Sequence, residues 1–209
     1  MPKIFIVHYE EDPEATVQFR MTARDYWTSH VTYIGRAIVS IMADLSDVSV
    51  IADHLNKTAE DIGQLLVPYY TADDAMTLTN LIKEHVAIGV NLVRAVRAGS
   101  STTTLATQNL ANATAIATFL DSLDSVNWPK DTVLTILTAH LACTTRQAVT
   151  RAAGDWTGSI AAFDECWTGI LTLADAFSMG IVDKFPEQFI KYEEYTGPVM
   201  AKKTEPKKK

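Results

Sequence analysis

Apolar residues recur at helical spacing along most of this 209-residue chain, from about residue 22 to residue 183. Because residues three or four apart share one face of a helix, the pattern gives each helix one stripe to bury. Two clear runs are Ile34, Ile38, Ile41 and Leu45, and Leu78, Leu81, Ile82, Val86, Val90 and Val93. The pattern predicts an all-α fold with six helices, near residues 20–44, 47–66, 72–98, 102–122, 129–152 and 156–183.

Turn and capping residues separate these helices by short connections. Asp73 or Thr71 precedes the third helix, Gly99 follows it, and Pro129 begins the fifth. Short connections favour antiparallel neighbours, so we expect an up-and-down bundle or an array of αα-hairpins.

Three histidines repeat at a fixed interval. His30, His85 and His140 lie 55 residues apart in each case, and each falls in an odd-numbered helix. The helices of the last two also end alike, as Arg97-Ala98-Gly99 and Ala152-Ala153-Gly154. The repeat predicts a six-helix up-and-down bundle built of three related αα-hairpins with a period of about 55 residues.

Several short stretches of this chain resemble those of a known family. They are Trp27-Thr28-Ser29-His30-Val31, Asp61-Ile62-Gly63, Pro68-Tyr69-Tyr70, Leu81-Ile82-Lys83-Glu84-His85, Asn112-Ala113, Ile116-Ala117, Phe119-Leu120, His140-Leu141, Thr144-Thr145, Ala174-Asp175, Gly180-Ile181 and Phe185-Pro186. In order and spacing, over about residues 25 to 189, the chain resembles a family of small all-helical bacterial and archaeal proteins of unknown function. Members are often labelled glycosyltransferase or acetylglutamate kinase, and relatives occur in large DNA viruses. The chain departs from the family at Tyr33-Ile34-Gly35, where relatives usually carry Trp-Thr-Arg, at Thr71, where they usually carry Gly, and at Gln147, where a Glu is common.

The enzyme labels do not fit the sequence. A kinase or nucleotide-dependent transferase needs a strand, a glycine-rich turn and a helix to hold phosphates, and an all-helical chain has no such unit. We therefore expect no enzymatic activity of this kind, and the resemblance supplies no catalytic residue.

The three equivalent histidines are the candidate site. If the hairpins pack around a pseudo-threefold axis, His30, His85 and His140 converge, and three imidazoles suit Zn²⁺ or another divalent metal. Glu84 and Asp61 are candidates for carboxylates that orient the ligands, and the alternative for both is a solvated charge on the helix surface. The alternative is that each histidine repeats a packing position and hydrogen-bonds to a neighbouring helix. The identity of any cofactor stays open.

The two cysteines carry no motif. Cys143 and Cys166 have neither CxxC spacing nor a companion cluster, so we expect neither a disulfide framework nor a cysteine-based zinc site. Cys143 lies three residues after His140 on the same helix face, but a lone cysteine in an apolar helix favours a packing role over a catalytic one. This usage suggests a reducing compartment.

The two ends differ from the helical region. We divide the chain into an N-terminal arm, 1–18, whose start is strand-like, a bundle domain, 19–189, and a C-terminal extension, 190–209. Residues 201–209 carry a charge of +4, although the chain as a whole is at −7. Such a lysine tail binds nucleic acid only weakly when the body is acidic, so protein partners or self-assembly through the arm and the tail are the expected contacts. We expect no transmembrane segment.

Two functions remain. The first is a non-enzymatic structural or interaction protein, which the viral relatives make concrete as a capsid-associated virion component. The alternative is a metal- or small-ligand-binding bundle that uses the three histidines. The expected location is intracellular and cytoplasmic, or the virion if the protein is viral.

Overall fold

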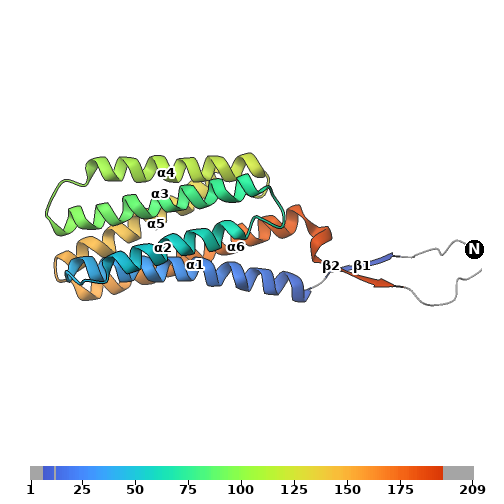
Figure 1. The fold of residues 1–209 in the computed structure, drawn as a ribbon, viewed down its shortest axis with the longest axis horizontal. Helices are drawn as coiled ribbons and strands as arrows, with labels where there is room; N and C mark the ends of the chain where they lie inside the picture. Colours follow the sequence, from blue (N-terminus) through green and yellow to red (C-terminus); the bar gives the residue numbers. More distant parts are fainter. Residues whose placement is uncertain (1–6, 12, 195–209) are drawn as a thin grey trace, which may run out of the picture.

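The computed structural model describes residues 7–11 and 13–194, with side chains placed from residue 13 to residue 190. It confirms the all-α six-helix bundle (Figure 1). The helices are α1 (Pro13–Met42), α2 (Val48–Gln64), α3 (Ala72–Arg97), α4 (Thr103–Leu123), α5 (Lys130–Ala152) and α6 (Trp156–Lys184). The first helix begins well before the expected residue 20.

The three odd-numbered helices form the inside of the bundle. α1, α3 and α5 contact one another, and each even-numbered helix packs against two of them. α2 packs against α1 and α3, α4 against α3 and α5, and α6 against α5 and α1, so the ring closes. All six helices run along the long axis of the molecule (Figure 1). No helix in the described part of the chain is both long and apolar enough to cross a bilayer.

Local sequence explains where the inner helices begin and end. The Thr71 hydroxyl accepts a hydrogen bond from the Asp74 backbone N–H, and the Asp74 carboxylate accepts one from the Thr71 N–H. This reciprocal pair satisfies N–H groups that the first turn of α3 leaves free. Gly99 and Gly154 follow α3 and α5 with φ of 64° and 75°, a left-handed conformation that glycine adopts without a steric penalty.

An ion-pair cluster joins the first helix to the last. Asp175 of α6 accepts hydrogen bonds from Arg24 Nε at 2.7 Å and from Arg20 Nη2 at 3.3 Å, both on α1. The guanidinium groups hold the pKa of the Asp175 carboxyl below its usual value. The cluster is partly exposed, so it fixes the register of the two helices more than it stabilises the fold.

Aromatic residues fill the main core. Trp128 stacks on Phe177 with ring centroids 5.3 Å apart, and its indole N–H donates to the Ala176 carbonyl at 3.1 Å. The indole fits against α6 only because residue 180 is glycine. A Cβ at Gly180 would overlap the indole nitrogen and lie 2.7 Å from Cε2.

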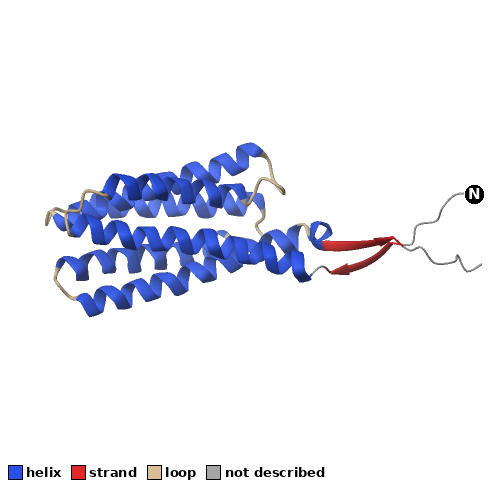
Figure 2. Cartoon of the chain, turned by 60° about the horizontal axis from the view of Figure 1, so that its bottom comes forward, coloured by secondary structure: helices blue, strands red, loops and turns tan. Residues whose placement is uncertain are grey.

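A two-stranded ribbon extends from one end of the bundle. β1 (Val7–Glu11) and β2 (Ile190–Glu194) pair antiparallel, with Val7 opposite Glu194 (Figure 2). The 3₁₀ turn η1 (Pro186–Phe189) leads into β2, and Phe189 is buried against Phe19 and Tyr69. The chain thus brings residues 7–11 of the arm and the start of the extension together. The lysine tail, residues 201–209, lies outside the described residues.

We predict that Gly180→Ala destabilises the bundle, because the added methyl group forces Trp128 away from α6. Overpacking of this kind costs about 1–3 kcal/mol. Gly169, on the same helix, has nothing within 4 Å of an added Cβ, so Gly169→Ala should instead stabilise by up to about 1 kcal/mol. Denaturant unfolding followed by circular dichroism measures both. Equal effects of the two substitutions would contradict this account.

Candidate metal centre

The three repeated histidines converge inside the bundle. The His30 and His85 ring centroids are 6.2 Å apart, and those of His85 and His140 are 5.7 Å apart. Each ring comes from a different member of the inner triangle: α1, α3 and α5. The 55-residue period therefore places equivalent residues around one point.

The rings surround a small enclosed cavity. It has a volume of about 20 Å³, and the three histidines are its only titratable lining residues. Its other walls are apolar: Trp27, Ile82, Ala113, Ile116, Leu137, Leu141, Ile170 and Leu173. One water or one ion needs about 10–15 Å³ by the same measure, so the cavity has room for a single small occupant.

Thr58 orients the first ring. The Thr58 hydroxyl donates to the Leu55 carbonyl at 2.8 Å, so its proton is already used. His30 Nδ1 lies 2.9 Å from the same oxygen and must be the donor in that contact. The proton is then on Nδ1, and Nε2 keeps a free lone pair. A hydrogen bond of this type fixes the tautomer that a metal-ligating histidine requires.

His140 has buried ring nitrogens with no partner. Its side chain is only 5% exposed, and neither Nδ1 nor Nε2 contacts a hydrogen-bonding group among the described residues. An unsatisfied buried polar atom costs about 1–3 kcal/mol. The packing hypothesis, in which each histidine hydrogen-bonds to a neighbouring helix, therefore accounts for His30 but not for His140.

Burial keeps the three rings neutral. It lowers the pKa of His85 to about 4 and that of His140 to about 3, with the nearby His85 adding to the effect at His140. Burial, with the His85 and His140 rings, also holds the pKa of His30 well below its usual value. Neutral imidazole is the form that binds metal, so the set is ready at neutral pH.

The spacing of the rings is close to that of a metal site. Three imidazoles bound to one Zn²⁺ at about 2.0–2.1 Å place their ring centroids about 5 Å apart. The observed separations of 6.2 and 5.7 Å exceed this by about an ångström or less. The rings must therefore move closer together by this amount to bind one ion.

The carboxylates expected beside the ligands are elsewhere, so this part of the prediction is wrong. Asp61 forms an ion pair with Lys57 one turn earlier on α2, and its side chain is 32% exposed. Glu84 is exposed and accepts a hydrogen bond from Asn112 Nδ2 at 3.1 Å. The residue next to His85 in sequence points away from it, because successive residues are about 100° apart around a helix. The sequence offered no signal for Thr58, whose hydroxyl takes the expected orienting role.

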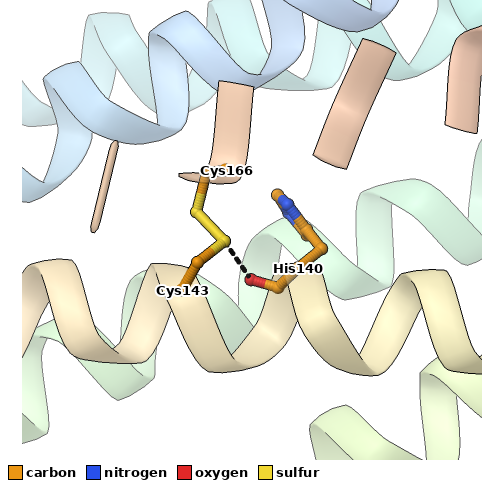
Figure 3. Close-up of side chains that lie close together, drawn as sticks. All are labelled: His140, Cys143 and Cys166. Atoms are coloured by element: carbon orange, nitrogen blue, oxygen red, sulfur yellow. Dashed lines mark hydrogen bonds between the residues drawn. A yellow bond between two sulfur atoms is a disulfide. The ribbon is translucent and has the colours of Figure 1, made fainter. Parts of the chain in front are cut away.

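The two cysteines form a disulfide, contrary to the expectation from their spacing. Cys143 of α5 and Cys166 of α6 are bonded, with Cα atoms 5.6 Å apart and both side chains buried. His140 and Cys143 point from one side of α5 toward Cys166 (Figure 3). Cys143 Sγ lies 3.1 Å from the His140 carbonyl oxygen. The sequence contained no motif here because the bond joins residues 23 apart on two separate helices.

Two of the three departures from the family pattern lie outside this centre, in one groove. Gly35 and Gln147 line a separate, open groove of about 530 Å³ between α1, α5 and α6. A Cβ at Gly35 would lie 3.6 Å from Gln147 Nε2, so the two positions face each other. Neither lines the histidine cavity.

Comparison with known proteins adds no relative. No family model, curated protein or solved structure matches the chain. The family resemblance stays a prediction.

We predict that the metal-free protein loses stability in mild acid. The unfolded chain protonates its histidines near pH 6.5, whereas the folded state holds these rings neutral to a much lower pH. Stability is therefore complete above about pH 6.5 and falls as the pH drops toward the folded pKa values. For His30 and His140, 2% and 5% exposed, the slope should approach a limit of about 1.4 kcal/mol per pH unit each below about pH 6.5, which gives a loss of about 1.4 kcal/mol each between pH 7.5 and pH 5.5.

Urea unfolding in the presence of a chelator, between about pH 7.5 and pH 5.5, measures this slope. His140→Leu should reduce the slope and raise stability at neutral pH, because it removes two unpartnered nitrogens. A free energy of unfolding that does not change across this range would contradict the assignment.

Proposed function

We propose that this protein is a non-enzymatic helical bundle that binds one divalent metal ion between His30, His85 and His140. The observation that carries the proposal is the convergence of three neutral imidazoles, those of His30 and His140 buried and that of His85 half-buried, on a cavity of single-ion size. The unpartnered nitrogens of His140 support it further, because a bound ion would satisfy one of them.

The ligand chemistry favours a borderline metal. Imidazole suits Zn²⁺, Cu²⁺, Ni²⁺ and Fe²⁺, whereas Mg²⁺ and Ca²⁺ prefer oxygen ligands. Three protein ligands leave a fourth position to water or a small ligand. The apolar walls leave no described carboxylate at the cavity to serve as a base, which supports a binding role over a hydrolytic one.

We predict that Zn²⁺ binds to the untagged protein at one equivalent and raises its melting temperature. With free metal at a hundredfold excess over Kd, the stabilisation is about 2.7 kcal/mol, or a shift of roughly 5–10 °C for a chain of this size. Calorimetric titration and thermal unfolding measure the two quantities. Thr58→Val, which removes the hydrogen-bond partner of His30 with little change of shape, should weaken binding about 10- to 100-fold.

His54 provides the matched control. It lies against Tyr33, with ring centroids 3.8 Å apart, and does not line the cavity. His54→Ala should leave the stoichiometry and affinity unchanged, whereas His85→Ala should abolish binding. Equal binding by the His85→Ala variant would remove the histidine cavity as the site.

The second candidate function is a structural or interaction role, of which a virion component is one specific case. The observation that favours it is the ribbon of β1 and β2, which projects beyond the helices (Figures 1 and 2). A two-stranded ribbon offers a free backbone edge on each strand, and such edges accept a further strand from a partner or a second copy. The ribbon joins the N-terminal arm to the C-terminal extension, which the sequence separates from the bundle.

We predict that deletion of residues 1–11 and 190–209 abolishes self-association and leaves the bundle folded. The truncated chain keeps Phe189, which packs in the main core, and all six helices. Light scattering after size-exclusion chromatography gives the mass, and circular dichroism gives the helix content. If full-length and truncated chains are both monomers, the ribbon does not mediate self-assembly.

A further inference from the structure

A second set of potential metal ligands shares His140 with the histidine cavity. One ligand atom each from His140, Cys143 and Cys166 lies within 4.8 Å of the other two, and all three residues are buried. His140 and Cys143 lie three residues apart on one face of α5, and Cys166 comes from α6 (Figure 3). In the disulfide form, neither sulfur has a thiolate lone pair to offer a cation.

We propose that the Cys143–Cys166 disulfide is a redox gate that converts the all-histidine site into a tighter thiolate site for a Zn²⁺-class metal ion. This inference rests on the proposed metal-binding function only for the oxidised protein, in which the three histidines are the ligands. In the reduced state the ligands are His140, Cys143 and Cys166, and His85 provides a further imidazole 5.7 Å from His140 between ring centroids.

The reduction of the disulfide and the binding of the metal are two steps, and each is balanced in atoms and charge. A small dithiol donates two electrons and two protons to the S–S bond, which breaks to give two cysteine thiols, and the dithiol leaves as its own cyclic disulfide. The divalent ion then displaces one proton from each thiol and forms two metal–sulfur bonds. No other reactant is needed.

Charge compensation explains why the reduced site binds more tightly. Three neutral imidazoles leave the full +2 charge of the ion in an apolar cavity, and the described lining residues include no carboxylate. Burial of an uncompensated charge is strongly unfavourable. Two thiolates make the site neutral overall and add the soft ligands that Zn²⁺ and Co²⁺ prefer to water.

The local structure accommodates free thiols. Cys143 Sγ lies 3.1 Å from the His140 carbonyl oxygen, so a thiol at this position has an acceptor in the preceding turn. Cys166 Sγ lies 3.6 Å from Thr144 Oγ1, which is a donor to a thiolate. Both cysteines therefore have polar neighbours that suit the reduced form.

The test is a Co²⁺ titration of the full-length, untagged protein in two states. One sample is oxidised with glutathione disulfide. The other is reduced with dithiothreitol, freed of reductant under nitrogen, and checked by thiol alkylation and mass spectrometry. Cobalt–thiolate charge transfer in the near ultraviolet reports sulfur ligation directly, and competition with a chelator gives the affinity.

We expect the oxidised protein to bind Co²⁺ without the charge-transfer band and to lose binding in His30→Ala. The reduced protein should show the band, bind at least about 100-fold more tightly, and retain the band in His30→Ala. The band should disappear in Cys143→Ser and in His140→Ala. Where a serine variant fails to fold, the double variant Cys143→Ala/Cys166→Ala, with helix content checked, replaces it.

The outcomes separate the two proposals. If the reduced protein binds Co²⁺ without the band, or no more tightly than the oxidised protein, the redox gate is overturned and the histidine site stands. If the band forms on reduction but the oxidised protein binds no metal, the thiolate site stands and the all-histidine function falls. If neither state binds metal, both are overturned.

Discussion

The contact among α1, α3 and α5 is the constraint on which the rest of this structure depends. Each of these helices brings one histidine to the same level, and the three rings occupy a centre that is otherwise apolar. The even-numbered helices cover the grooves between them, so the ring of hairpins closes around the triangle. Because burial keeps the histidines neutral there, the fold and the proposed site impose the same requirement, namely that the rings remain unprotonated.

The helical architecture was predictable because it is encoded locally. Periodic apolar residues and the glycines after α3 and α5 fix the helices, and the 55-residue period fixes the equivalence of the hairpins. The start of α1 was placed too late because residues 13–19 carry little apolar periodicity. The pairing of β1 with β2 joins the two ends of the chain, and no local pattern specifies such a distant partner.

The candidate site also has features that the sequence predicts and features that it does not. Convergence of the histidines followed from their period, since equivalent positions in a closed ring face a common axis. Thr58 and the disulfide depend on which faces of neighbouring helices meet, and this is decided by packing rather than by spacing. Glu84 adjoins His85 in sequence and Asp61 could have faced the histidines from a neighbouring helix, yet each binds a surface partner, Asn112 or Lys57.

The disulfide and a bound metal are alternative ways to hold α5 against α6. A disulfide that closes a loop of this length contributes about 3 kcal/mol by restricting the unfolded chain. Its reduction would remove that contribution at the point where His140 already has two unpartnered nitrogens. An ion bound to one residue of α6 and two of α5 restores a cross-link between the same helices and supplies the missing partner to one nitrogen. With such an ion bound, as proposed, reduction of the disulfide would leave α5 and α6 cross-linked.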